Sequence, residues 1–112
     1  MATIVTSYDA INSPLVITLS WELPDENSDS VTEYEILIQT KDGAWVEDSV
    51  DCEASVDPIL SARTCDVQLT TLRSNPYLLV YNDLVVAKGR ASNSKGFGHY
   101  SEPNILGARV TQ

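Results

Sequence analysis

The strongest constraint on the fold is an alternation of apolar and polar side chains that recurs along several short segments. It is clearest in residues 15–22, 31–39, 64–69 and 84–92. A period of two places every second side chain on the same face of a β-strand, which is typical of half-buried antiparallel strands. No segment shows the period of a helix. With the shorter extended segments included, this spacing predicts an all-β sandwich of seven strands.

Turns that contain glycine or proline separate the alternating segments. Asp42-Gly43 favours a tight hairpin that leads into a short strand beginning at Trp45. A second hairpin is predicted where the strand at 84–92 breaks into residues 93–98 and another extended segment returns. The chain should therefore fold largely through strands that pair with their neighbours in sequence.

The strand at 84–92 has unusually small residues on its predicted inward face. Its outward face carries Lys88 and Arg90, which places both charges in water. Gly89 leaves room that a bulky side chain from the facing sheet must fill, and we expect Trp21 to fill it. The inward positions are Val85, Ala87, Gly89 and Ala91.

Length and charge limit the classes of function. A chain of 112 residues is a single domain, residues 1–112. Its net charge of −9, with only seven scattered Lys and Arg, argues against nucleic acid or an anionic membrane as partner. No apolar run is long enough to insert into a membrane, and the N-terminus does not read as a signal peptide. If the protein is secreted, we expect a mature form or a domain of a longer chain.

Several motifs, in order along the chain, resemble a fibronectin type III domain. Residues 20–24 (SWELP) resemble the end of that family's second strand, and residues 31–36 (VTEYEI) resemble its third. Residues 91–98 (ASNSKGFG), followed by Ser101, resemble its glycine-bearing turn. The resemblance implies a seven-stranded, immunoglobulin-like antiparallel β-sandwich with the family's topology. Together with the small residues of the strand at 84–92, the resemblance predicts a structural core of Trp21, Tyr34, Ile36, Leu72, Gly89, Asn93 and Gly96.

The chain departs from the family pattern in two places. Val85 stands where the family usually has a tyrosine that ties a loop to the sheet, so Tyr77 or Tyr81 must supply that tie or it is absent. The segment at 47–64 is longer than usual and brings two cysteines. This variant is similar to repeats of large surface proteins of single-celled eukaryotes.

Cys52 and Cys65 are the two cysteines of the chain. They form neither a C-x-x-C redox pair nor a four-ligand zinc set. A disulfide that closes the long loop is the favoured interpretation, and it would indicate an extracellular or cell-surface location. Two buried free thiols in a cytosolic protein are the alternative.

Residues 25–29 contain a weak candidate for a calcium site. Asp25, Asn27 and Asp29 have the spacing of the first three ligands of a calcium loop. Ser30 stands where glycine is needed, however, and Ile36 takes the place of the bidentate carboxylate. A solvated loop is therefore favoured, and we expect no metal and no other cofactor.

The sequence offers little for catalysis. The single histidine, His99, follows the glycine turn and has no serine or cysteine nucleophile in its context. We therefore expect that the protein is not an enzyme. Trp45, on a short strand near a sheet edge, is the one candidate partner contact, although a tryptophan there more often caps a sandwich.

The sequence is best interpreted as a non-catalytic extracellular or surface module. We expect a structural or adhesive repeat of a larger assembly, whose partners are neighbouring domains of the same type or other surface proteins, self-association included. One alternative is a receptor-like module that binds a ligand through the loops at 23–30 and 93–97. A calcium-dependent junction domain is the other.

Overall fold

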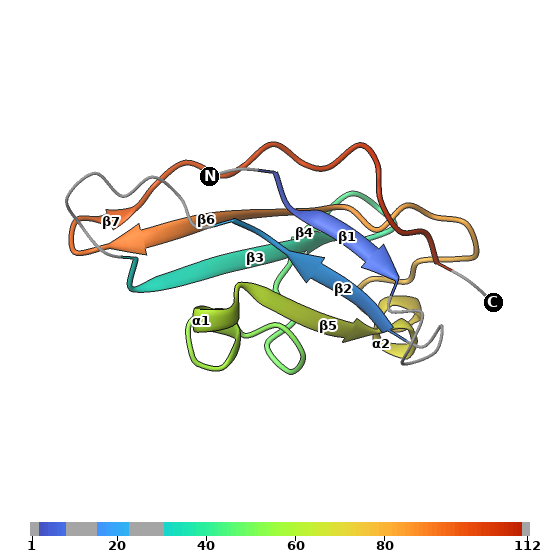
Figure 1. The fold of residues 1–112 in the computed structure, drawn as a ribbon. Helices are drawn as coiled ribbons and strands as arrows, with labels where there is room; N and C mark the ends of the chain where they lie inside the picture. The colour runs from blue at the N-terminus through green and yellow to red at the C-terminus, as the bar shows by residue number, and fades with distance from the viewer. Residues whose placement is uncertain (1–2, 9–15, 23–30, 111–112) are drawn as a thin grey trace.

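The computed structural model describes residues 3–8, 16–22 and 31–110, and its strands form two antiparallel sheets (Figure 1). The smaller sheet has three strands in the order β1-β2-β5. These strands are β1 (Val5–Tyr8), β2 (Val16–Ser20) and β5 (Thr64–Gln68). The chain is therefore all-β, as the alternation of side chains predicted.

The larger sheet has four strands in the order β4-β3-β6-β7. Its strands are β3 (Glu33–Gln39), β4 (Trp45–Val46), β6 (Ala87–Asn93) and β7 (Gly96–Phe97). The two central strands, β3 and β6, are the longest, and they pair from Glu33 opposite Ser92 to Ile38 opposite Ala87. The strand predicted at 84–92 thus lies in the middle of this sheet.

Two one-turn helices contradict the expectation that the chain has none. They are α1 (Ile59–Ala62) and α2 (Leu69–Arg73). Leu69, predicted as the last inward residue of a strand, is instead the first residue of α2, although its side chain is buried. Helices of a single turn are too short to produce a recurring period of 3.6, so no periodic signal revealed them.

The hydrophobic core draws side chains from both sheets. The predicted inward residues of β3, which are Tyr34, Ile36 and Ile38, are all buried. Ile17 and Leu19 of β2 are also buried, as their alternation predicted. The remaining core side chains include Ile4, Cys65, Val67, Leu72, Val85 and Val110.

The prediction that Trp21 fills the space beside Gly89 is wrong. A Cβ built on Gly89 would lie 2.7 Å from Ile36 Cδ1 and 3.2 Å from Ile4 Cδ1, so these two side chains take up the space. Ile36 is the direct cross-strand partner of Gly89 within the same sheet. The ring of Trp21 instead meets Tyr34 edge-on, with centroids 5.5 Å apart.

The hairpin between β6 and β7 is tighter than the sequence predicted. β6 begins only at Ala87, and β7 consists of two residues, so Tyr100 is not part of a strand. Asn93 is half-buried, and its side-chain oxygen accepts the Lys95 backbone N–H at 2.8 Å. Gly96 is exposed, with φ of +108°, a value that favours glycine. Asn93 and Gly96 therefore shape the turn and do not pack in the core.

The chain after β7 continues along the free edge of β6 without forming a regular strand (Figure 1). Gly98 N–H donates to Ala91 O at 2.9 Å, and Ser101 N–H donates to Gly89 O at 2.7 Å. The Ser101 hydroxyl accepts Gly89 N–H at 3.1 Å. The Ser101 side chain thus pairs with a backbone N–H of β6 that a neighbouring strand would otherwise bind.

Asn104 extends this replacement of strand pairing by a side chain. Its Oδ1 accepts Ala87 N–H at 2.8 Å, and its Nδ2 donates to Val85 O at 3.0 Å. Nδ2 also donates to Leu106 O at 2.9 Å. The Asn104 side chain is buried, and its one amide pairs with two buried backbone groups: the N–H of Ala87, the first residue of β6, and the carbonyl of Val85 just before the strand.

The other lateral side of the molecule is crossed by the segment after β4. Ala54 O accepts Tyr34 N–H from β3 at 3.1 Å. Asp51 Oδ2 accepts Gln68 N–H from β5 at 3.3 Å. The segment therefore contacts one strand of each sheet, and it brings Cys52 beside β5.

Candidate functional site

The outer face of the larger sheet holds a row of stacked aromatic and cationic side chains. Successive side chains of β3 alternate between the buried face and the outer face, so Glu33, Glu35 and Leu37 point outward. Lys88 and Arg90 of β6 point to the same side, because Lys88 pairs with Leu37 and Arg90 pairs with Glu35. Both residues therefore lie on the outer face, as the alternation predicted, and their side chains are half-buried there.

Five residues of this face form an aromatic–cation ladder, in which rings and cations alternate. Lys88 Nζ lies 4.4 Å from the ring centroid of Trp45 and 4.5 Å from that of Tyr100. Arg90 Cζ lies 4.7 Å from the Tyr100 centroid and 4.2 Å from the Phe97 centroid. These distances are those of cation–π contacts, each of which stabilises the arrangement by about 0.5–1 kcal/mol at an exposed site.

Glu35 fixes the centre of the ladder. Its Oε1 accepts hydrogen bonds from the Tyr100 hydroxyl and from Arg90 Nε, the latter at 3.0 Å. The hydrogen bond from Tyr100, with help from Arg90, holds the pKa of Glu35 below its ordinary value. The same hydrogen bond raises the pKa of Tyr100. The ring between the two cations is therefore held by directed bonds as well as by stacking.

Further carboxylates lie beside the ladder. The pKa of Glu47 is raised, first by burial and then by repulsion from Glu53, Glu35 and Glu33. Glu33 comes from β3 and Glu47 follows β4, so this acidic row lies along the β4 side of the face. The face thus carries an acidic row next to a basic one.

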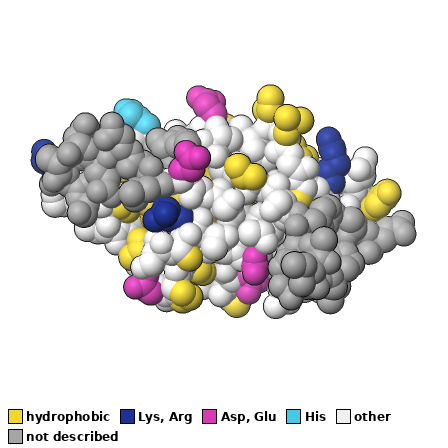
Figure 2. Space-filling model, viewed as in Figure 1, with side chains coloured by type: hydrophobic (Ala, Val, Ile, Leu, Met, Phe, Trp, Pro, Cys, Tyr) yellow, Lys and Arg dark blue, Asp and Glu magenta, His cyan; other side chains and the backbone are white. Residues whose placement is uncertain are grey.

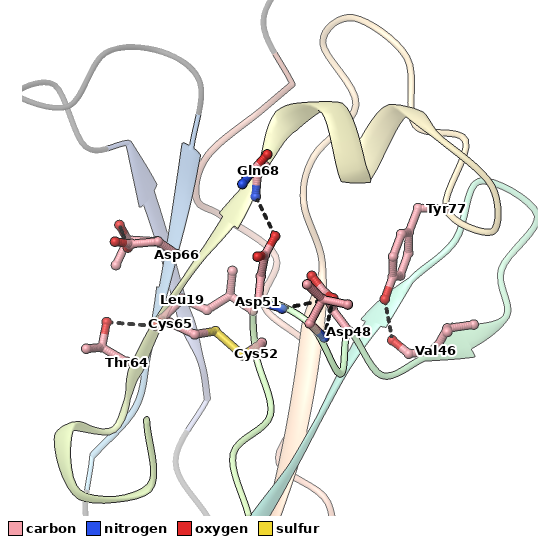
Figure 3. The surroundings of a disulfide bond; sticks show 12 residues. Leu19, Val46, Asp48, Asp51, Cys52, Thr64, Cys65, Asp66, Gln68 and Tyr77 are labelled. Atoms are coloured by element: carbon pink, nitrogen blue, oxygen red, sulfur yellow. Dashed lines mark hydrogen bonds between the residues drawn. A yellow bond between two sulfur atoms is a disulfide. The ribbon is translucent and has the colours of Figure 1, made fainter. Parts of the chain in front are cut away.

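Cys52 and Cys65 form a disulfide that joins the long loop to β5 (Figure 3). Asp48 shapes the loop just before it, because its Oδ1 accepts Val50 N–H at 3.1 Å and Asp51 N–H at 3.2 Å. The Asp48 carbonyl accepts Cys52 N–H at 2.9 Å. The bridge is therefore built into an ordered turn, and it sits in the core.

Tyr77 ties the chain after α2 to β4 (Figure 3). Its hydroxyl donates to Val46 O at 3.2 Å, and its ring is buried. Burial, together with the charges of Asp48 and Glu47, raises the pKa of Tyr77 to about 12. Of the two tyrosines that the sequence offered for a loop-to-sheet tie, Tyr77 makes such a hydrogen bond, whereas Tyr81 is exposed.

The candidate sites from the sequence fall in different places. Asp25, Asn27 and Asp29, and with them the loop at 23–30, lie outside the described residues. Within the described residues, no group of three or more His, Cys, Asp or Glu side chains could hold a metal ion. His99 is exposed beside the ladder, and Trp45 forms one end of it.

The ladder as a whole was missed by the sequence reasoning. The alternation in 84–92 did place Lys88 and Arg90 on the outward face, which was the available signal. Phe97 and Tyr100 come from beyond the turn: Phe97, in β7, is placed by its pairing with Ser92, and the position of Tyr100 depends on the irregular path of the chain after β7. On the face of the molecule that Figure 2 presents, charged and hydrophobic side chains are scattered among other atoms.

Comparisons with protein-family models, with curated proteins and with solved structures find no match for this chain. Among the described residues, no helix is long and apolar enough to cross a membrane. Function is therefore argued from the geometry of the described residues, above all from the ladder and the disulfide.

Proposed function

We propose that this chain is a non-catalytic module of an extracellular or surface-exposed protein. It serves as a structural or adhesive unit that makes contacts with other protein domains. Its fold is proposed to be a seven-stranded immunoglobulin-like sandwich with fibronectin type III topology. The aromatic–cation ladder on the outer face of the larger sheet is the observation that carries the functional proposal.

The strand order supports the finer description of the fold. The first, second and fifth strands share one sheet, while the third, sixth and seventh share the other. This matches the division of strands in an immunoglobulin-like domain. The fourth strand lies beside the third and not beside the fifth. Of the sequence motifs that resemble fibronectin type III domains, the first begins at the last residue of β2, the second overlaps β3, and the third spans the β6–β7 hairpin.

The ladder has the composition of a protein-binding surface. Tryptophan, tyrosine and arginine are the residues most enriched among those that dominate binding energies. Phe97 and Tyr100 remain 42% and 37% exposed, although neighbouring cations hold their rings in place. A partner that covers them would bury apolar area without having to order these side chains, which lowers the entropy cost of binding.

The disulfide and the charge support an extracellular setting. Disulfides persist in oxidising compartments and are rare in the cytosol. The Cys52–Cys65 bond is buried and joins two ordered segments, so it acts as part of the scaffold. The net charge of −9 keeps such a domain soluble at a crowded surface.

Bead adhesion tests the proposal. Beads coated with the domain should adhere to one another or to the surface of the cells that make the protein. Replacing both Phe97 and Tyr100 by serine should abolish adhesion, whereas Val50→Ser, at an 88% exposed position on the disulfide loop, should not. Absence of adhesion by the unmodified domain, or full adhesion by the double variant, would overturn the proposal.

A further inference from the structure

We infer that the outer face of the larger sheet binds a second copy of this chain in a two-fold symmetric contact. The inference deepens the proposed function, because it names the surface and the partner. It requires only association of the domain with itself, so it can fail while the broader proposal stands.

Two rows of opposite charge lie side by side on this face. The basic row consists of Lys88 and Arg90 on β6. The acidic row consists of Glu33 on β3 together with Glu47 and Glu53 just after β4. Cross-strand pairing of β3 with β6 sets the two rows next to each other on one surface.

A two-fold axis normal to the face would place each row on its opposite in the partner. The acidic row of one copy then covers the basic row of the other, and the reverse contact forms at the same time. Most approaches between two chains of charge −9 are repulsive. Complementary rows therefore select this orientation from the many that are disfavoured.

Lys88 and Glu47 are the two groups that such a contact would satisfy. The Lys88 ammonium lies between the rings of Trp45 and Tyr100 and forms no close ion pair among the described residues, although its charge helps to lower the pKa of Glu35. Glu47 forms no ion pair among the described residues, and its carboxylate is repelled by those of Glu53, Glu35 and Glu33. Arg90, by contrast, is already paired with Glu35. The cation and the anion that form no ion pair within the described ranges thus lie on opposite rows.

The aromatic rings supply the apolar part of the contact. Trp45, Tyr100 and Phe97 run across the face beside the two rows, and the half-buried Leu37 and Val86 lie on the same side. A specific interface combines a core of such anchors with polar groups at its rim. The face offers both.

Charge reversal in pairs tests this inference in solution by sedimentation equilibrium, at chain concentrations up to about 1 mM. The unmodified chain should form dimers that weaken in about 1 M salt, where the screening length falls to about 3 Å. Lys88→Glu and Glu47→Lys should each weaken the dimer by at least about tenfold, because both create like-charge contacts. The control variants Arg73→Glu and Glu22→Lys change exposed charges away from the face and should leave the dimer unchanged.

Restoration provides the decisive readout. A mixture of the Lys88→Glu chain with the Glu47→Lys chain should form a heterodimer, because every facing pair is then of opposite charge. The double variant, with both changes in one chain, should again form a homodimer. A chain that stays monomeric throughout overturns the inference, and so does a dimer that neither reversal weakens or that the mixture fails to restore. A monomer whose beads still adhere to cells would leave the proposed function in place.

Discussion

Asn104 holds the free edge of β6 through one side chain, and Asn104→Ala would remove all three of its hydrogen bonds. Two of them satisfy buried backbone groups, Ala87 N–H at 2.8 Å and Val85 O at 3.0 Å. The third, to Leu106 O at 2.9 Å, is only partly buried. The alanine variant would leave the first two groups without a partner, while water could reach the third.

The expected loss follows from these partners. A buried backbone group left unpaired costs about 1–3 kcal/mol, so two such groups cost about 2–6 kcal/mol. We expect a decrease near 4 kcal/mol in the free energy of unfolding, which is a large share of the 5–15 kcal/mol typical of a domain. Asn104→Asp keeps the acceptor for Ala87 N–H but turns a carboxylate oxygen toward Val85 O. At neutral pH it should be destabilised at least as much as the alanine variant.

Urea unfolding followed by circular dichroism measures this loss, and hydrogen exchange of the Ala87 amide reports the local effect. Exchange at Ala87 should accelerate more than exchange in β2, which Asn104 does not contact. Ile105→Ala is the matched control, because the neighbouring side chain is 85% exposed and its removal should cost less than about 0.5 kcal/mol. A loss below about 1 kcal/mol for Asn104→Ala, or native stability for Asn104→Asp, would refute the reasoning.

Three further predictions concern other contacts. Replacing Cys52 and Cys65 together by serine should lower the free energy of unfolding by about 3 kcal/mol, measured by urea unfolding, because their separation of 13 closes a sizeable loop; an unchanged midpoint would contradict this. Gly107→Ala should lower the free energy of unfolding by at least about 2 kcal/mol, because φ of Gly107 is +143° and a Cβ would lie 2.0 Å from the hydroxyl oxygen of Thr6 in β1. The control Gly43→Ala should lower it by less, because Gly43 has φ of +96° and no atom within 4 Å of the added Cβ. The lowered pKa of Glu35 means that its stabilisation is complete above the ordinary value of 4.5 and is lost as pH falls through the lowered pKa. In the Glu35→Gln variant, Tm should therefore decrease less as the pH is lowered. An unchanged dependence of Tm on pH would contradict the role of the Glu35 carboxylate in the ladder.

The sequence predicted the strands best where one face of the strand is buried and the other is exposed to solvent. Ile17, Leu19, Ile36 and Ile38 were correctly placed inward, because a period of two in the sequence directly records alternating burial. The same argument placed Lys88 outward. It could not reveal that the ammonium lies between two rings, since that depends on where a distant segment crosses.

The incorrect predictions concern features that depend on tertiary contacts. Asn104 and Ser101 replace a strand with side-chain groups, so no alternation marks the edge they cover. The space beside Gly89 was assigned to the wrong side chain because packing depends on register, and cross-strand pairing places Ile36 opposite it. Local patterns record burial, whereas these features depend on tertiary contacts.

The irregular segments on the two lateral sides have a consequence for repeated copies. Like domains tethered in one chain hold each other at effective concentrations of about millimolar, and an open strand edge would then let their sheets fuse. Here the run at 98–110 lies against β6, and the run at 47–54 meets both β3 and β5. In neighbouring copies of this domain, these edges of β3, β5 and β6 would thus already be occupied by the domain's own chain.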